Sequence, residues 1–335
     1  SMTQARSITA TFTAAHTLTV SQTGSGAGGV TSSPAGIDCG SDCSENFLHG
    51  TAVTLTPLAD EHSDFSGWTG CTSVTGDTCT VELTSSTTVT ASFTQRTYAL
   101  QVDRSGSGSG SVGSSDAGIM CGADCSHTFG SGTSVTLTAT PATGSVFWSW
   151  TGCDSVTGTQ CTVTLTSERT VTATFKKQYR LEVTTSGSGT VTSSSSGIDC
   201  PSDCAEDVVD GTTVTLTATP ASGSIFTGWS GGGCSGTGTC VITVGGDTTV
   251  AASFATAFTL TVNRMGPGIV SSSPGGISCG ADCVEVYQSG TSVTLTATST
   301  GGTGTITWGG ACLGTIGSQC TVTMSANRSV SVTFS

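Results

Sequence analysis

The sequence predicts an all-β protein in which four tandem, disulfide-stapled repeats form a rod-like array. Three observations predict this fold class. Sixteen cysteines recur at a fixed spacing, apolar and polar residues alternate in short runs, and Gly, Ser and Thr dominate the segments between those runs. Alternation with a period of two residues is typical of a half-buried strand, and no segment of useful length has the period of a helix.

The cysteines define the repeat, whose period is about 80 residues. Each copy has the order C-x3-C, a spacer of 27 to 29 residues and C-x7-C, which shortens to C-x5-C in the third copy. We expect repeats at residues 14–94, 95–176, 177–255 and 256–335. Residues 1–13 are expected to hold the final strand of a preceding repeat, or only the start of the expressed segment, because Ile8–Phe12 matches the last run of a repeat.

The strands expected within one copy follow a common order. An alternating run such as Leu100–Val102 comes first and is followed by a Gly/Ser turn. The strongest strand candidate, for example Val135–Ala139, follows the second cysteine and is rich in β-branched residues. A Phe and Trp unit and a Gly-rich loop come next. Two further runs, as at Cys161–Leu165 and Val171–Phe175, end the copy.

The joints between copies are short. Three or four residues, none of them Pro or Gly, separate Phe93 from Tyr98, Phe175 from Tyr179 and Phe254 from Phe258. A flexible Gly/Ser tether would have a different composition. Compact domains of this size are roughly 30 Å across, so four in line would reach on the order of 120 Å.

The succession of motifs resembles a known family. It runs from Val214–Pro220 (Val-Thr-Leu-Thr-Ala-Thr-Pro) through Gly223–Gly231 to a final Thr-Val-x-Ala-x-Phe, and it resembles the divergent internalin-type B repeat of bacterial surface proteins in all four copies. The resemblance implies a small β-grasp-like module, a surface or secreted location, and a spacer or adhesive role rather than catalysis. The chain departs from the plain repeat by inserting Gly-Ile-x-Cys-Gly-x-Asp-Cys and by carrying four cysteines in each copy.

Composition excludes several classes of partner. The net charge is −13, from 9 Lys and Arg against 22 Asp and Glu, so the chain has no basic stripe for nucleic acid or an anionic membrane surface. No apolar run reaches the roughly 18 residues of a membrane-spanning helix, and no signal peptide precedes the first repeat. Sixteen cysteines in a chain with few core-forming residues indicate an oxidising, extracellular location. The expected partners are the neighbouring repeats, with a glycan or a surface protein as a further possibility, and no cofactor.

The cysteines fit structural disulfides better than zinc or redox catalysis. The second pair is too widely spaced for a typical zinc site, no His recurs beside it, and neither C-x-x-C nor a helix appears. Pro201 replaces a Gly found in the other copies, which suggests position i+1 of a type I turn and favours two local rings in each repeat. Loop-closure entropy favours crossed pairs such as Cys39 with Cys71, so that alternative stays open. The sixteen expected disulfide residues are Cys39, Cys43, Cys71, Cys79, Cys121, Cys125, Cys153, Cys161, Cys200, Cys204, Cys234, Cys240, Cys279, Cys283, Cys312 and Cys320.

Two other residue types recur in every copy. An Asp before the second cysteine is interpreted as an Asx-type lock on the turn, with a calcium ligand as the alternative. A Trp beside the third cysteine is interpreted as a core plug, with a sugar-stacking platform as the alternative. Trp148 has no counterpart in the other copies and is the best candidate for an exposed binding residue. The recurring residues are Asp42, Asp124, Asp203 and Asp282, and Trp68, Trp150, Trp229 and Trp308.

The sequence offers no catalytic constellation. His16, His49, His62 and His127 occupy non-equivalent positions, and none has a nucleophile or carboxylate at a suggestive spacing. We therefore expect a non-enzymatic chain that serves as an extracellular spacer or stalk of a large bacterial surface or secreted protein. The alternative is an adhesin segment that binds a glycan or a surface protein through variable loops.

Overall fold

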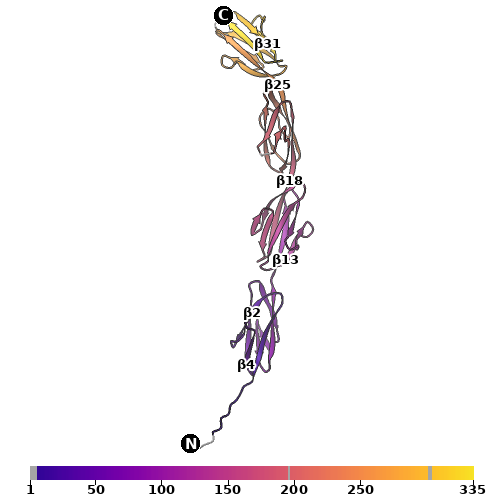
Figure 1. Cartoon of the computed structure of the whole chain (residues 1–335), viewed down its shortest axis with the longest axis vertical. Coiled ribbons are helices and arrows are strands. Elements are labelled where there is room, and N and C mark those ends of the chain that lie inside the picture. The colour runs from indigo at the N-terminus through magenta and orange to yellow at the C-terminus, as the bar shows by residue number, and fades with distance from the viewer. Residues whose placement is uncertain (1–5, 195–196, 301–303) are drawn as a thin grey trace. The chain divides into compact units, whose positions relative to one another are not determined.

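A computed structural model describes residues 6–194, 197–300 and 304–335, and these residues form strands, turns and loops without a helix (Figure 1). The all-β prediction is confirmed. The chain divides into two compact units, Ser1–Phe175 and Lys176–Ser335. Each unit holds two of the predicted repeats.

The first unit contains strands β1 to β17 and the beginning of β18. Residues 6–14 form no strand, and the side chains of Ile8 and Phe12 in that segment are 93% and 92% exposed. The strands are β1 (Ala15–Thr23), β2 (Gly28–Ser33), β3 (Asp38–Cys39), β4 (Ser44–Leu48), β5 (Ala52–Ala59), β6 (Ser63–Thr69), β7 (Ser73–Thr75), β8 (Thr78–Glu82), β9 (Thr87–Gln95), β10 (Thr97–Ser105), β11 (Gly110–Ser114), β12 (Met120–Cys121), β13 (Ser126–Gly130), β14 (Ser134–Pro141), β15 (Ser145–Thr151), β16 (Ser155–Thr157), β17 (Gln160–Thr164) and β18 (Arg169–Ser186).

Each repeat of this unit is built from two sheets. In repeat 1 the first sheet has the order β4-β1-β9-β6, in which β1 and β9 run parallel and the outer pairs antiparallel. The second sheet has the order β3-β2-β5-β8-β7 and is antiparallel. Repeat 2 repeats this plan with β13-β10-β18-β15 and β12-β11-β14-β17-β16.

The second unit follows the same plan in repeats 3 and 4. Its mixed sheets have the orders β21-β18-β25-β23 and β28-β25-β32-β30, and its antiparallel sheets have the orders β20-β19-β22-β24 and β27-β26-β29-β31. The remaining strands are β19 (Gly189–Ser193), β20 (Asp199–Cys200), β21 (Ala205–Val209), β22 (Thr213–Pro220), β23 (Ser224–Gly231), β24 (Cys240–Thr243), β25 (Thr248–Met265), β26 (Gly268–Ser273), β27 (Ser278–Cys279), β28 (Val284–Gln288), β29 (Ser292–Ser299), β30 (Ile306–Gly310), β31 (Gln319–Thr323) and β32 (Arg328–Phe334).

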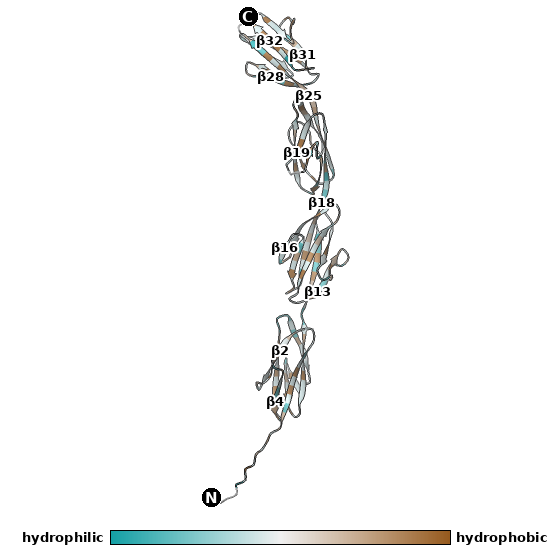
Figure 2. Ribbon diagram, in the orientation of Figure 1, coloured by the Kyte–Doolittle hydropathy of each residue, from teal (hydrophilic) through white to brown (hydrophobic). Residues whose placement is uncertain are grey.

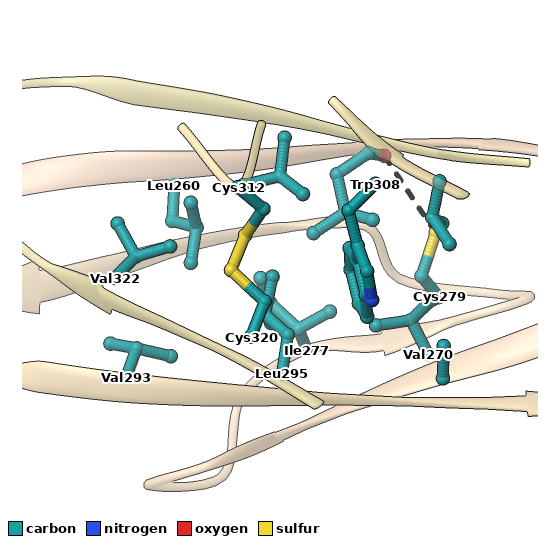
Figure 3. Close-up of a cluster of buried hydrophobic side chains, with 14 of the residues drawn as sticks. Leu260, Val270, Ile277, Cys279, Val293, Leu295, Trp308, Cys312, Cys320 and Val322 are labelled. Carbon is teal, nitrogen blue, oxygen red and sulfur yellow. Dashed lines mark hydrogen bonds between the residues drawn. A yellow bond between two sulfur atoms is a disulfide. The ribbon is translucent and has the colours of Figure 1, made fainter. Parts of the chain in front are cut away.

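The two sheets of a repeat face each other across one apolar core. In repeat 4, Leu260 and Trp308 of the mixed sheet lie in one buried cluster with Val293 and Leu295 of the antiparallel sheet (Figure 3). The alternation along the strands, visible as brown bands in Figure 2, sends every second side chain into this core. The parallel pair at the centre of the mixed sheet is the β-grasp-like feature, and a second sheet covers it where a β-grasp fold has a helix.

A glycine closes each repeat. In repeat 2 the turn after β10 approaches β18, and the N–H of Gly108 donates to the carbonyl of Phe175 at 3.0 Å. Gly106 in the same turn has φ of +93°, and a Cβ there would overlap the Phe175 carbonyl. Only a glycine fits this approach, because it lacks a Cβ and tolerates positive φ.

Candidate functional site

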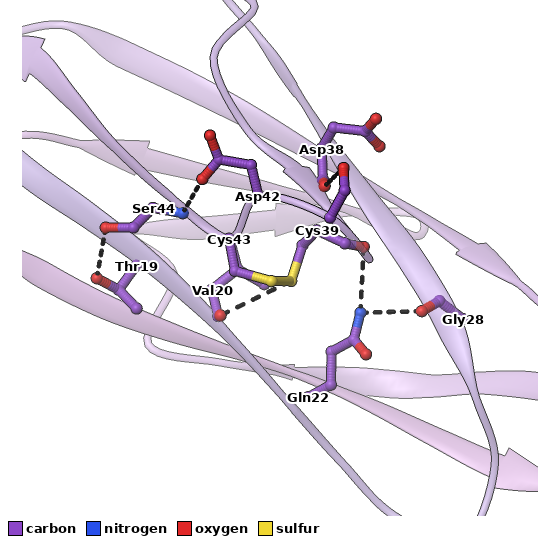
Figure 4. Close-up of a disulfide and its surroundings, with 10 residues drawn as sticks. Thr19, Val20, Gln22, Gly28, Asp38, Cys39, Asp42, Cys43 and Ser44 are labelled. Atoms are coloured by element: carbon purple, nitrogen blue, oxygen red, sulfur yellow. Dashed lines mark hydrogen bonds between the residues drawn. A yellow bond between two sulfur atoms is a disulfide. The ribbon is translucent and has the colours of Figure 1, made fainter.

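The C-x3-C segment connects the two sheets of a repeat. In repeat 1, Cys39 lies on edge strand β3 of the antiparallel sheet, and Cys43 precedes edge strand β4 of the mixed sheet. The structure bonds Cys39 to Cys43, with Cα atoms 4.2 Å apart (Figure 4). The Cys43 carbonyl accepts a hydrogen bond from the N–H of Val20 at 2.8 Å, which attaches the turn to the central strand β1.

The turn itself differs from the expected one. In repeat 3 the N–H of Ser202 donates to the carbonyl of Asp199, so the turn begins at Asp199 and Pro201 occupies position i+2. The Cys200–Pro201 peptide is cis, as in type VI turns. The prediction that Pro201 stands at i+1 of a type I turn is therefore wrong, because the turn starts one residue earlier than expected.

The recurring aspartate locks this turn. In repeat 1 the carboxylate of Asp42 accepts a hydrogen bond from the N–H of Ser44 at 3.3 Å (Figure 4). The same contact, from the residue two positions on, recurs in the other three repeats at 3.2 to 3.4 Å. The Asx interpretation is confirmed by these bonds.

The second disulfide lies beside the recurring tryptophan. Cys71 follows edge strand β6 of the mixed sheet and is bonded to Cys79 on β8 of the antiparallel sheet. The indole N–H of Trp68 donates to the carbonyl of Asp77 in the loop that the disulfide closes, at 2.8 Å. The other three repeats have the same indole-to-loop hydrogen bond. Trp150, Trp229 and Trp308 are buried and Trp68 is half-buried, as expected of a core plug.

The two rings of a repeat are short along the chain but join opposite sheets in space. One lies near each edge of the facing pair of sheets, and the strands between the edges are held by packing and hydrogen bonds. The described residues include no free cysteine. The pairs are Cys39–Cys43, Cys71–Cys79, Cys121–Cys125, Cys153–Cys161, Cys200–Cys204, Cys234–Cys240, Cys279–Cys283 and Cys312–Cys320.

Trp148 lies on β15 with its side chain 55% exposed. By the Phe-x-x-Trp spacing it is equivalent to Ser66 in repeat 1 and Thr227 in repeat 3. In those repeats the strand register shifts at this residue, so Ser66 and Thr227 are the extra residues of a β-bulge. Bulges often re-aim a side chain next to a functional site. The position equivalent to Trp148 is therefore a bulge in repeats 1 and 3, and the Gly that follows it there is Ser149 in repeat 2.

The joint between repeats 1 and 2 is polar. Arg96 lies between β9 and β10; its N–H donates to the carbonyl of His62, and its carbonyl accepts from the N–H of Ser131 at 2.7 Å. The imidazole Nδ1 of His62 lies 2.9 Å from the hydroxyl of buried Ser131. The Arg96 guanidinium pairs with Asp64 at 2.9 Å, and this contact raises the pKa of Arg96. Repeat 2 thus contacts the β5–β6 loop of repeat 1 through side chains as well as backbone.

The joint between repeats 3 and 4 is shorter and less polar. Strand β25 runs through it without a break, from Thr248 to Met265. The N–H of Ala257 donates to the carbonyl of Gly223, and the carbonyl of Thr256 accepts from the N–H of Ser289 at 2.8 Å. The Ala257 side chain is buried at this joint.

A family model described as the divergent InlB B-repeat domain matches four segments of the chain, residues 16–97, 102–178, 179–257 and 258–335. The chain belongs to the divergent InlB B-repeat family. The resemblance inferred from the sequence is therefore confirmed. No curated protein is significantly similar to the chain in sequence.

Several solved structures are similar to this chain at low identity and with low TM-scores. The chain spans less than two thirds of the first two relatives named here. The Bacillus anthracis TIE protein is 9% identical, with 91% of this chain and 65% of that chain covered and a TM-score of 0.26. The pilus adhesin SpaC from Lactobacillus rhamnosus GG, in its open conformation, is 11% identical, with 73% of this chain and 44% of that chain covered and a TM-score of 0.27. Two B repeat units of the collagen binding protein of Staphylococcus aureus are 10% identical, with 97% of this chain and 100% of that chain covered and a TM-score of 0.14.

The B-repeats have few perturbed ionisable groups. In repeat 2 the N–H of Thr164 and the guanidinium of Arg169 both donate to Asp154 and lower the pKa of that carboxyl. In repeat 4, burial raises the pKa of Tyr287, whose hydroxyl lies 2.8 Å from that of Ser272.

Among the described residues, no cluster of three or more His, Cys, Asp or Glu side chains could hold a metal ion. No helix among them is long and apolar enough to cross a membrane.

The histidine side chains make contacts of different kinds. His127 packs its ring against Phe129, whereas His16 and His49 of repeat 1 are brought together. This pairing could not be predicted from the sequence, because 32 residues separate the two histidines along the chain.

Proposed function

We propose that this chain is an extracellular spacer that separates a distal domain from the bacterial surface, or separates domains of a large secreted protein. The observation that carries the proposal is the joint. In the first unit, the linking residue Arg96 is hydrogen bonded to His62 of repeat 1 and to Ser131 of repeat 2. In the second unit, the linking residues are bonded in the same way to Gly223 of repeat 3 and to Ser289 of repeat 4. A linker bonded on both sides resists reorientation better than a free tether does.

The disulfides support the same role. Each B-repeat has a small core, and small secreted domains depend on such bridges for stability. A bridge near each edge of the facing sheets opposes fraying where strands are exposed to proteases. The eight bridges fit an extracellular, oxidising location.

The spacer proposal is tested by scattering from chains with two, three and four repeats. A spacer with stiff joints gives a maximum dimension that rises by roughly 30 Å for each repeat added. A matched four-repeat chain with the four residues Gly-Ser-Gly-Ser inserted after Arg96 should give a smaller average dimension and a broader distance distribution. An unchanged distribution after the insertion would contradict the proposed stiffness.

An adhesin role is the second candidate, and Trp148 is the observation that favours it. An exposed indole such as that of Trp148 can stack on a sugar ring or insert into a pocket of a partner protein. Repeats 1 and 3 offer a matched substitution, since Ser66 occupies the equivalent position. Binding of wild-type chain to a glycan array, abolished by Trp148→Ser, would support this role. Equal binding by the wild-type chain and by Trp148→Ser would show that Trp148 takes no part in glycan binding.

The repeat boundaries at residues 14, 95, 177 and 256 are also proposed. Thermal unfolding of chains that begin at residues 95, 177 and 256 tests them, because a chain cut at a true boundary should keep the Tm of the repeats that remain. A fall in that Tm on cutting at one of these residues would contradict that boundary.

A further inference from the structure

We propose that His16 and His49 form a chelating site for a divalent late transition metal ion, with Cu²⁺ preferred. The observation is that His16 Nε2 and His49 Nδ1 lie 3.0 Å apart, with ring centroids separated by 5.2 Å. This inference does not depend on the proposed spacer role.

Strand pairing brings the two rings together. His16 lies near the start of β1 opposite Phe47, and the next pair toward the end of the sheet is Ala15 with Leu48. The N–H of His49 donates to the carbonyl of Ala14 at 2.7 Å, which continues the ladder by one residue. His16 and His49 are therefore diagonal neighbours on one face of an antiparallel pair, a position in which long side chains meet. The ladder fixes both backbones before any ion arrives.

The separation of the nitrogens favours one coordination geometry. Imidazole nitrogens bind metals at about 2.0 to 2.1 Å, so two nitrogens 3.0 Å apart subtend about 95° at a shared ion. That angle suits adjacent positions of a tetragonal complex, which Cu²⁺ and Ni²⁺ adopt with nitrogen and oxygen ligands, better than the wider angle of tetrahedral Zn²⁺. Cu²⁺ also has the highest affinity in the divalent series.

The site is open enough to accept the ion. His49 is exposed and His16 is half-buried, so water can fill the other coordination positions. In the metal-free pair one ring donates its proton to the other. Binding requires that the donor ring carry its proton on its second nitrogen, so both facing nitrogens present lone pairs without a change in total protonation.

The other repeats provide built-in controls. In none of the other repeats do the equivalent positions hold two histidines. These positions are Tyr98 and Ser131 in repeat 2, Tyr179 and Asp210 in repeat 3, and Phe258 and Ser289 in repeat 4. The proposal therefore predicts one ion per chain rather than four.

The test is calorimetric titration of the four-repeat chain, free of any affinity tag, with copper chloride. We expect one equivalent to bind, with a copper electron paramagnetic resonance spectrum that shows two imidazole nitrogens. His16→Tyr and His49→Ser introduce residues that repeat 2 already accommodates, and each should weaken binding roughly a hundredfold by removing the second ligand of the chelate. His127→Ala should leave the affinity unchanged.

Two further measurements make the result decisive. Bound copper should raise the Tm of the wild-type chain, because an ion that binds only the folded state stabilises it. The same melting curves without copper show whether His16→Tyr and His49→Ser are folded. The proposal is overturned if folded variants bind copper as tightly as wild type, or if wild type takes up no copper at tens of micromolar.

Discussion

The joint between repeats 1 and 2 and the joint between repeats 3 and 4 make equivalent backbone hydrogen bonds with different numbers of residues. Four residues separate Phe93 from Tyr98, but three separate Phe254 from Phe258. In the longer joint Arg96 alone donates to the preceding loop and accepts from the following repeat. In the shorter joint Ala257 donates and Thr256 accepts, and the strand continues unbroken.

The difference shows that the backbone pairing of a joint tolerates an extra residue when side chains take up the added space. The extra residue interrupts the strand, and the space around it is filled by His62, Ser131 and the guanidinium contacts of Arg96. The shorter joint needs only the buried methyl group of Ala257. Of these two joints, the longer one is therefore polar and the shorter one apolar.

The largest expected change in stability comes from opening a disulfide ring. It tests whether equivalent rings stabilise repeats 1 and 4 equally although their joints differ. Cys39→Ser with Cys43→Ser in repeat 1, and Cys279→Ser with Cys283→Ser in repeat 4, each open a five-residue ring, which should cost about 2 kcal/mol of unfolding free energy by the loop-closure estimate. Denaturant titration of the two double variants should give similar losses. A loss confined to one repeat would mean that its joint, rather than its ring, determines its stability.

The second prediction separates the two joints directly. Ser131→Ala removes the hydrogen-bond partner of His62 and should cost about 1 kcal/mol of unfolding free energy. Ser289→Ala changes the equivalent exposed residue of repeat 4 and should stay within about 0.5 kcal/mol. Denaturant titration of both variants measures the difference. Equal costs would show that the His62 contact contributes nothing to the longer joint.

A third prediction concerns salt. Arg96→Ala should speed the amide exchange of Ser131, which donates to the Arg96 carbonyl, because the guanidinium no longer holds the start of β6 through the carboxylate of Asp64. The effect should shrink as salt rises, since the screening length falls from about 8 Å at 0.15 M to about 3 Å at 1 M. Exchange of the Ser289 amide in the shorter joint should be insensitive to salt and serves as the control.

The smallest effect is a pH dependence within repeat 2. Hydrogen bonds from Thr164 and Arg169 lower the pKa of Asp154, so the carboxylate stabilises the fold above its unfolded pKa of about 3.9 and loses this contribution as pH falls through the folded pKa. The difference in Tm between wild type and Asp154→Asn should therefore vanish in strong acid. Thr72 is the neutral acceptor at the equivalent position of repeat 1, so a Thr72→Val difference should not vary with pH in this way.

The sequence predicted the fold from local patterns and missed contacts that depend on exact register. Alternation located the strands, and the repeated cysteines located the modules. The turn at Pro201 was misplaced by one residue, because a proline fixes its own φ without fixing where the turn begins. The pairing of His16 with His49, the bulges at Ser66 and Thr227, and the contact of His62 with Ser131 arise from strand register, which no single segment of sequence encodes.

The short disulfide rings have a consequence for how the cysteines of the chain find their partners during folding. Each cysteine lies four, six or eight residues from its partner, whereas Cys79 lies 42 residues from Cys121, the first cysteine of the next repeat. Loop closure becomes less probable with roughly the 3/2 power of length, so Cys79 meets Cys71 about tenfold more often than it meets Cys121. Pairing can then finish within a repeat before the next one emerges. A gene that gains or loses a repeat would leave the remaining bridges correctly matched.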